Sequence, residues 1–220
     1  VRCFSERKGK MIWYVIPARQ GSKGFPLKNR KLFDSTINSI PTYMRDRTIV
    51  TSDDEEILKK AELCGAKILK RSKDLATDEA PIKSVMQDVT KKFKMNQDDI
   101  VVMLYLTYPE RTWRNIEDAL DYFETEKQNS LLCSKKLLSH PYLCMVSEQG
   151  NKGTQVIEHD LYRRQDYPEC FEISHFVCIF KVFSLNTLNN NMYNNHTVFY
   201  PIEDVIDVDT PYDFMKWKKR

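Results

Sequence analysis

The chain has 220 residues, enough for one domain that buries roughly 70–75% of the surface exposed by its unfolded chain. A net charge of +3, with 30% charged residues, excludes a strongly basic or acidic chain, so any basic patch must be local. No apolar stretch approaches the roughly 18–20 residues of a membrane span, so we expect no membrane partner. The six cysteines show no C-x-x-C spacing, which gives zinc sites no support. They are scattered through apolar runs, as reduced buried thiols are, which favours an intracellular, cytoplasmic protein.

The first ten residues, VRCFSERKGK, are polar and lack the apolar core of a secretory signal. We expect residues 1–10 to be an extension, disordered or foreign to the natural chain. The folded domain is then expected over 11–220.

Strand-like and helix-like segments alternate along the domain. Predicted strands cover 12–17, 48–52, 66–70, 99–105, 129–134, 174–181 and 197–201, and helical patterns cover 54–64, 80–94 and 114–126. This alternation favours an α/β fold, a mainly parallel sheet with helices on both faces. Because ligands bind at the carboxyl ends of such strands, one rim is expected to hold the loops 18–29, 52–53, 71–79 and 106–112.

The region 136–173 interrupts this alternation. It is polar, contains Gly150 and Gly153, and carries only short strand-like runs. We predict an arm or subdomain here.

The first predicted strand leads directly into a basic loop. The apolar run from Ile12 to Ile16 stops at Pro17 and is followed by Arg19, Gly21, Lys23, Gly24 and Lys28. Glycines allow the backbone to approach a ligand closely, and successive N–H groups with nearby cations can hold a polyphosphate. The loop is not a Walker A sequence, because no Gly-Lys-Ser/Thr follows. The alternative interpretation is a solvated basic turn.

Near the end of the chain, IDVDT places two carboxylates two residues apart. In a strand, Asp207 and Asp209 lie on one face, with Ile206 and Val208 on the other. Such carboxylates repel each other unless a cation lies between them, and hard oxygen ligands suit Mg²⁺. The alternative is that Asp209 or Thr210 caps a helix beginning near Pro211. We prefer capping for Thr210, and a favourable helix-dipole contact for Asp213.

Six motifs resemble one known family in order and in kind: ARQGSKGFPLKN (18–29), TIVTSDDEEI (48–57), LKRSKDLATDEA (69–80), YPERT (108–112), RRQDYP (163–168) and IDVDTPYDF (206–214). The family is the CMP-sugar synthetases, or acylneuraminate cytidylyltransferases, and the motifs span nearly all of 12–216. The resemblance implies a Rossmann-like nucleotidyltransferase fold with a projecting dimerisation arm. It also implies a homodimer that transfers a cytidylyl group from CTP to an acidic sugar with Mg²⁺ as cofactor.

The resemblance also assigns roles to the residues that match the family motifs. The implied catalytic residues are Arg19, Lys28 and Asp209, with Asp207 and Asp209 on the metal. The implied nucleotide ligands are Arg19, Ser22, Lys23, Lys28, Asn29, Arg71 and Asp78. The implied sugar ligands are Tyr105, Arg164 and Gln165, with Arg164 presented by a partner's arm. The alternatives are a helix N-cap for Asn29, a solvated arginine for Arg71, and pairing with Asp166 or Glu169 for Arg164.

Departures from the family pattern concentrate at the sugar end. Tyr105 replaces a glutamine, Pro81 and Ile82 replace a serine pair, Leu143 replaces a lysine, and Ser174-His175 replace Asn-Gly. We expect His175 and Phe176 to add bulk, and the pocket to be narrow, apolar and poor for N-acetylneuraminate.

Three alternatives to a nonulosonic acid synthetase stay open. One is the same reaction on another acid, such as a deoxy-octulosonate or phosphonate. Another is a weakened nucleotide-binding regulator. The third, nucleic-acid binding through Arg30, Lys31 and the cations of the basic loop, is disfavoured because it gives Asp207 and Asp209 no role.

Overall fold

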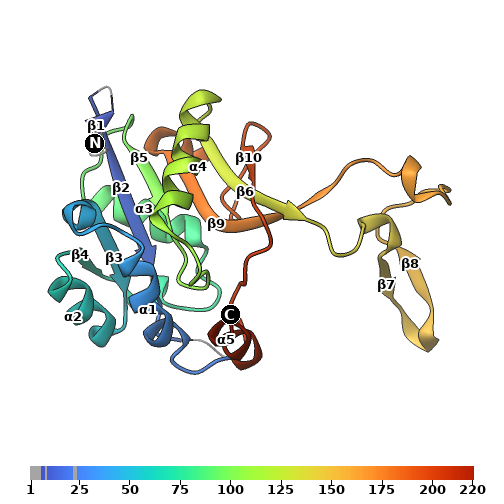
Figure 1. Cartoon of the computed structure of the whole chain (residues 1–220), viewed down its shortest axis with the longest axis horizontal. Helices are drawn as coiled ribbons and strands as arrows, with labels where there is room; N and C mark the ends of the chain where they lie inside the picture. Colours follow the sequence, from blue (N-terminus) through green and yellow to red (C-terminus); the bar gives the residue numbers. More distant parts are fainter. Residues whose placement is uncertain (1–5, 8, 22–23) are drawn as a thin grey trace.

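Eight strands form the main sheet in a computed structural model, which describes residues 6–7, 9–21 and 24–220 (Figure 1). The strand order is β10 (Val198–Pro201), β6 (Ser130–Lys136), β9 (Phe171–Lys181), β5 (Ile100–Met103), β2 (Lys10–Pro17), β3 (Thr48–Ser52) and β4 (Lys67–Lys70), with β1 (Glu6–Arg7) beside β2. Only β9 and β1 are antiparallel to their neighbours. The predicted mainly parallel sheet is therefore confirmed.

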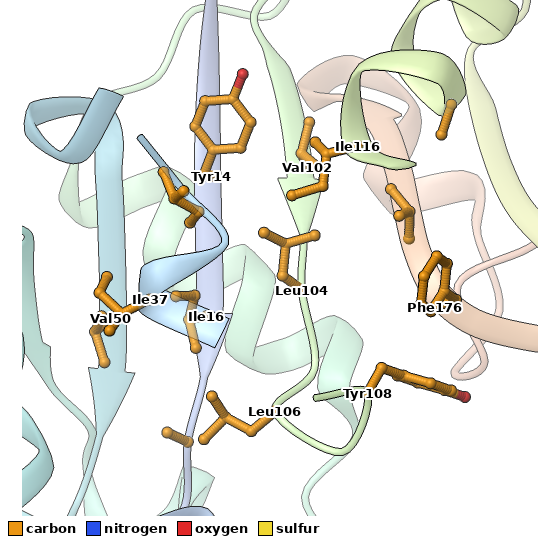
Figure 2. Close-up of a cluster of buried hydrophobic side chains, with 14 of the residues drawn as sticks. Tyr14, Ile16, Ile37, Val50, Val102, Leu104, Leu106, Tyr108, Ile116 and Phe176 are labelled. Carbon is orange, nitrogen blue, oxygen red and sulfur yellow. The ribbon is translucent and has the colours of Figure 1, made fainter. Parts of the chain in front are cut away.

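Alternating side chains on the central strands divide the core into two layers. On β2, Tyr14 and Ile16 enter one cluster and Val15 the other, and on β5 Val102 and Val101 divide in the same way. Figure 2 shows the first cluster, where Tyr14, Ile16 and Val102 project from neighbouring strands. This period of two is what a strand buried on both faces requires.

Helices cover both faces, as predicted. The first cluster is covered by α1 (Lys28–Asn38), α2 (Glu55–Leu63) and α4 (Trp113–Thr125), and the second by α3 (Ile82–Lys92) with the 3₁₀ turn Val182–Thr187. The helical patterns at 54–64, 80–94 and 114–126 correspond to α2, α3 and α4. A final helix, α5 (Pro211–Lys218), follows the extended segment after β10. No helix in the described part of the chain is long and apolar enough to cross a bilayer.

The beginning of the chain corrects one expectation. Glu6 and Arg7 pair with Met11 and Lys10 in an antiparallel ladder, and Lys10 already belongs to β2. A disordered extension over 1–10 is therefore wrong for these strand residues. Residues 1–5 and 8 lie outside the described part.

A long extension leaves the sheet between β6 and β9. It carries an antiparallel hairpin of β7 (Met145–Ser147) and β8 (Gly153–Gln155) and lies well away from the sheet in Figure 1. Four rings, those of His140, Tyr142, His159 and Tyr167, pack together in it, with Tyr142 and His159 stacked at 4.2 Å. We call residues 137–170 the arm. Its role in dimerisation stays a prediction.

Candidate active site

A cavity of about 330 Å³ opens at the carboxyl end of the parallel strands. Its lining comes from the loops that follow β2, β4 and β5, together with the first turns of α1 and α3. The loop after β3 adjoins them, because Asp53 accepts a hydrogen bond from the backbone N–H of Gln20 at 2.8 Å. The predicted common rim is therefore confirmed. Predicted site residues that line the cavity are Arg19, Lys28, Asn29, Arg71, Asp78 and Tyr105.

Two cations of the basic loop that line this cavity contact carboxylates. Arg19 forms an ion pair with Asp78, and Lys28 Nζ lies 2.7 Å from Asp209 Oδ1. The Lys28 side chain is only 12% exposed, whereas that of Asp209 is 69% exposed. The loop is thus not a simple solvated turn: it joins the N-terminal and C-terminal parts of the site. Ser22 and Lys23 lie outside the described residues.

Asn29 fixes the shape of the basic loop from within α1. Its Nδ2 donates to the carbonyl of Arg19 at 2.7 Å. The N-cap of α1 is Leu27, which has a left-handed backbone with φ of 57°, so the N-cap alternative for Asn29 is wrong. The sequence signal for Leu27 as the helix boundary was weak, because leucine rarely adopts this conformation.

The next two cations of α1 contact groups of the fold. Arg30 Nε donates to Asp54 Oδ2 at 2.6 Å, and Asp54 is the N-cap of α2. The ammonium of Lys31 lies 4.5 Å from the centre of the Phe25 ring. These contacts hold α1 against its neighbours and give both side chains a structural role.

Arg71 is buried at the end of β4. It is 7% exposed, and its Nη2 donates to the carbonyl of Thr51 at 3.0 Å while its backbone N–H donates to Ser52. Burial lowers the pKa of its guanidinium to about 10, which leaves it charged at neutral pH. Its Nε has no hydrogen-bond partner in the described structure. The alternative of a solvated loop arginine is therefore wrong.

The segment that carries Asp207 and Asp209 is extended but is not a strand. Ile206 and Val208 enter the core, and the N–H of Val208 donates to Thr107 at 2.8 Å. The predicted strand is therefore wrong, although the predicted alternation of buried and outward residues holds. The reason is that β5 ends at Met103, so no strand lies beside this segment to form a ladder.

Asp207 is half buried beside the loop that follows β5. Burial raises the pKa of its carboxyl group, and hydrogen bonds from Thr107 and Tyr108 oppose that rise. Its Oδ1 is buried and has no hydrogen-bond partner among the described residues. A buried carboxylate oxygen without a partner is costly, and a cation would relieve that cost.

The donor set at Asp207 and Asp209 fits Mg²⁺. No group of three or more metal-binding side chains occurs among the described residues. Two carboxylates therefore leave most of the coordination shell to phosphate oxygens and water, which is the way Mg²⁺ is usually held beside a nucleotide. The partnerless Oδ1 of Asp207 supports this fit.

Thr210 and Asp213 form the N-terminal cap of α5. The Thr210 side chain accepts from the N–H of Asp213 at 3.2 Å, and Asp213 accepts from the N–H of Thr210 at 2.8 Å. The Thr210 hydroxyl also donates to the Asp213 carboxylate at 2.6 Å, and this hydrogen bond, helped by the one from the Thr210 N–H, lowers the pKa of Asp213. The capping interpretation is confirmed for Thr210, and Asp209 is not the cap.

Tyr105 lines the cavity where β5 ends, and Arg111 fixes its backbone. Arg111 is 3% exposed and donates through Nη2 to the carbonyl of Tyr105 at 2.8 Å and through Nη1 to that of Phe176 at 2.6 Å. Sequence reasoning missed this role, although Arg111 lies in the YPERT motif. Phe176 is buried in the core against Tyr108, so the expectation that it narrows the pocket is wrong (Figure 2).

The remaining predicted sugar ligands lie on the arm. Arg164 and Gln165 are exposed and, with Leu143, belong to the part of the chain that extends away from the sheet in Figure 1. Asp166 pairs with Arg163 at 2.7 Å, so the alternative pairing of Arg164 with Asp166 is wrong. The structure does not bring these residues to the cavity of their own chain.

Comparison with known proteins matches residues 13–219 to the family model described as cytidylyltransferase. An N-acylneuraminate cytidylyltransferase of Streptococcus agalactiae is 27% identical over 91% of this chain, and the chain spans about half (51%) of that relative's length. A pseudaminic acid cytidylyltransferase of Campylobacter jejuni is 31% identical over 71% of this chain and 72% of that protein.

Among solved structures, a CMP:2-keto-3-deoxy-manno-octonic acid synthetase complexed with CTP shares the fold. The TM-score is 0.67 at 14% identity, over 94% of this chain and 97% of that one. The resemblance read from the six motifs is thereby confirmed. The chain belongs to the cytidylyltransferase family of the CMP-sugar synthetases.

Proposed function

We propose that the protein transfers a cytidylyl group from CTP to an acidic sugar, a nonulosonic acid, releasing pyrophosphate. The observation that carries this proposal is the convergence of cations and carboxylates on one cavity. Arg19, Asp78, Lys28 and Arg71 line the cavity, and Lys28 is also ion-paired with Asp209, which lies beside it. The names of the relatives, which include neuraminate and pseudaminate enzymes, support the class of acceptor.

The basic loop would hold the triphosphate of CTP. The acceptor would attack the α-phosphate in line with the leaving pyrophosphate. This attack places negative charge on the equatorial oxygens of the α-phosphate and on the pyrophosphate. The Arg19 guanidinium offers a planar fork to two of these oxygens, whereas the Lys28 ammonium acts as a point charge. Both cations already face carboxylates in this structure, so phosphate oxygens would exchange with Asp78 and Asp209 as their partners.

Asp207 and Asp209 would hold Mg²⁺, which neutralises phosphate charge when it is bound. The half-buried position of Asp207, next to Thr107 and Tyr108, supports this role. Val208, between the two carboxylates, is anchored in the core and by its bond to Thr107. The chain thereby fixes the backbone from which both carboxylates project.

The acceptor would enter beside Tyr105. The half-buried Tyr105 places a large aromatic ring with a single hydroxyl at this wall of the cavity, where the family pattern has an amide. Acidic sugars with deoxygenated carbons lose fewer polar contacts at such a wall than N-acetylneuraminate does. We therefore propose that a deoxygenated nonulosonic acid is preferred.

Pyrophosphate release from CTP and Mg²⁺ tests both the reaction and the acceptor. The panel is N-acetylneuraminate, legionaminate, pseudaminate and deoxy-octulosonate, compared by kcat/KM. A tenfold preference for N-acetylneuraminate, about 1.4 kcal/mol, would contradict the proposed acceptor. CTP binding without turnover of any acid would favour the alternative of a weakened, nucleotide-binding regulator. The presence of Tyr105 in place of the family's glutamine is compatible with that alternative.

We further propose a cytoplasmic homodimer in which each arm completes the partner's cavity. Arg164 and Gln165 are exposed, do not line the cavity of their own chain, and belong to the arm, which extends away from the sheet (Figure 1). The arm also exposes large apolar side chains, with Leu138 98% and Tyr162 88% exposed. A second copy of this chain would cover these side chains and bring Arg164 to the acceptor carboxylate.

A further inference from the structure

Two departures from the family sequence pattern, far apart in the chain, touch each other in the structure. Tyr105 follows β5 and His175 lies on β9, and their ring centres are 5.6 Å apart with planes at 84°. An edge-to-face contact of this kind is a favoured geometry for aromatic rings. The replacement of the family's glutamine by Tyr105 is thus matched by the replacement of its glycine by His175.

His175 is itself held in place from the far side. Its Nε2 lies 3.0 Å from the carbonyl of Asn191, and since a carbonyl only accepts, the imidazole nitrogen donates. The loop that carries Asn191 is closed by its own hydrogen bonds, with Asn189 accepting from the N–H groups of Asn191 and Tyr193. The orientation of the imidazole ring is therefore set by a backbone carbonyl in a loop that has its own hydrogen bonds.

Tyr105 is held at its backbone as well as at its ring. Its carbonyl accepts from Arg111, and the same guanidinium donates to Phe176, the residue after His175. The Ser174 hydroxyl, one residue before His175, lies 3.4 Å from the Tyr108 hydroxyl. Three consecutive residues of β9 thus fix the loop that begins at Tyr105.

We infer that His175 is a positioning residue that fixes the Tyr105 ring against the cavity, so that the two side chains form one specificity element for the acceptor. This inference rests on the proposed function, because Tyr105 faces the acceptor only if the cavity binds CTP and a sugar acid. The ligand class is an acidic sugar that presents deoxygenated carbons or methyl groups to the ring. Removing His175 frees the ring to turn and changes acceptor binding without touching the phosphate site.

The test is a double-mutant cycle of His175→Ala and Tyr105→Gln, assayed with the best acceptor of the panel. His175→Ala is expected to raise the acceptor KM about three- to tenfold, the range that one aromatic pair contributes, with the CTP KM within about twofold of the parent. In the Tyr105→Gln background the same change should alter the acceptor KM by less than about twofold. His175→Phe, which retains an aromatic edge, should stay near the parent.

His196→Ala is the matched control, since His196 is an exposed histidine near the end of the loop that carries Asn191 and its side chain does not line the cavity. Equal effects of His175→Ala in both Tyr105 backgrounds would overturn the inference. If the parent turns over no acid at all, the proposed function fails. Thermal unfolding of the parent, the two single variants and the double variant then tests whether the two rings are coupled. Additive changes in Tm would then show that the two rings are not coupled, whereas non-additive changes would support their pairing.

Discussion

Asp209 is the residue on which the proposed chemistry depends most directly. Its carboxylate is exposed and contacts Lys28, and Asp209→Asn retains the shape of the side chain while it removes the charge. Asp209→Asn is expected to lower kcat about 100-fold or more, because removing one stabiliser of transition-state charge costs a few kcal/mol. Pyrophosphate release measures kcat, and thermal unfolding checks that the fold is retained.

The control for this change is Asp204→Asn, which removes an exposed carboxylate from the same extended segment. It should leave the rate unchanged. A rate for Asp209→Asn within about threefold of the parent would remove Asp209 from the metal and phosphate site, because a lost charge contact there costs far more.

Arg71 is expected to decide between cytosine and uracil. The edge of cytosine presents acceptors and an amino donor that a guanidinium with backbone groups can match, and a mismatch leaves buried polar groups unpaired at a cost of about 1–3 kcal/mol. The parent should prefer CTP over UTP, and Arg71→Lys should reduce that preference by about tenfold. Arg114→Lys, at an arginine side chain 79% exposed, is the control. Equal turnover of CTP and UTP by the parent would contradict the assignment.

At the scale of residues, sequence reasoning succeeded where a role depends on neighbours in the chain. The cap at Thr210 and Asp213 needs only four consecutive residues, and it is present as predicted. The roles of Arg71 and Arg111 depend on hydrogen bonds to backbone carbonyls of strands that are distant in the sequence, and no local sequence pattern predicts such bonds. The sequence therefore leaves open a solvated side chain for Arg71 and does not reveal the role of Arg111.

At the scale of elements, the cap of α5 gives a pH-dependent prediction. Hydrogen bonds from Thr210 lower the pKa of Asp213, so the stabilisation is present above the ordinary pKa of an aspartate and is lost as the pH falls through the lowered value. Asp213→Asn should therefore lower the Tm at neutral pH, by an amount that corresponds to about 1 kcal/mol for a capping group. As the pH falls through the lowered pKa of Asp213, its carboxyl becomes protonated and the difference in Tm should shrink. A difference in Tm that stays constant through this acidic transition would contradict this account.

Helices and strands were predicted best where buried side chains repeat regularly. The apolar stripes of helices α2, α3 and α4 and the apolar runs of strands β2 and β5 show this regular repeat. The helix α1 went unpredicted because its first turn is the end of the basic loop, although Leu32, Phe33 and Ile37 are buried. The strand proposed for 206–209 failed for the opposite reason: the alternation was present, but strand pairing depends on a neighbour that the sequence does not reveal.

At the scale of the whole molecule, the proposed shared sites predict complementation between two inactive proteins. Arg164→Ala should lose the acceptor contact that the arm supplies, and Asp209→Asn should lose the metal contact within the cavity. A mixed dimer then contains one cavity with neither change, so mixing should restore part of the activity. Pyrophosphate release from mixtures measures it, after subunit exchange has been shown by light scattering or native mass spectrometry.

The control mixture combines Asp207→Asn with Asp209→Asn, which both change the proposed metal site. Every cavity of such a mixed dimer carries one of the two changes, so this mixture is not expected to complement. Subunits that exchange without any gain in activity for the first mixture would argue against a site completed by the partner.

The arm leaves and rejoins the sheet at paired positions, and this has a consequence for how such a protein can change over generations. Lys136, the last residue of β6, lies opposite Phe171, the first residue of β9, so the ladder fixes the two ends of the arm side by side. Residues can be gained, lost or exchanged between these points without shifting the register of any strand. The part of the chain proposed to read the sugar can thus diversify without a change in the sheet or in the proposed nucleotide site.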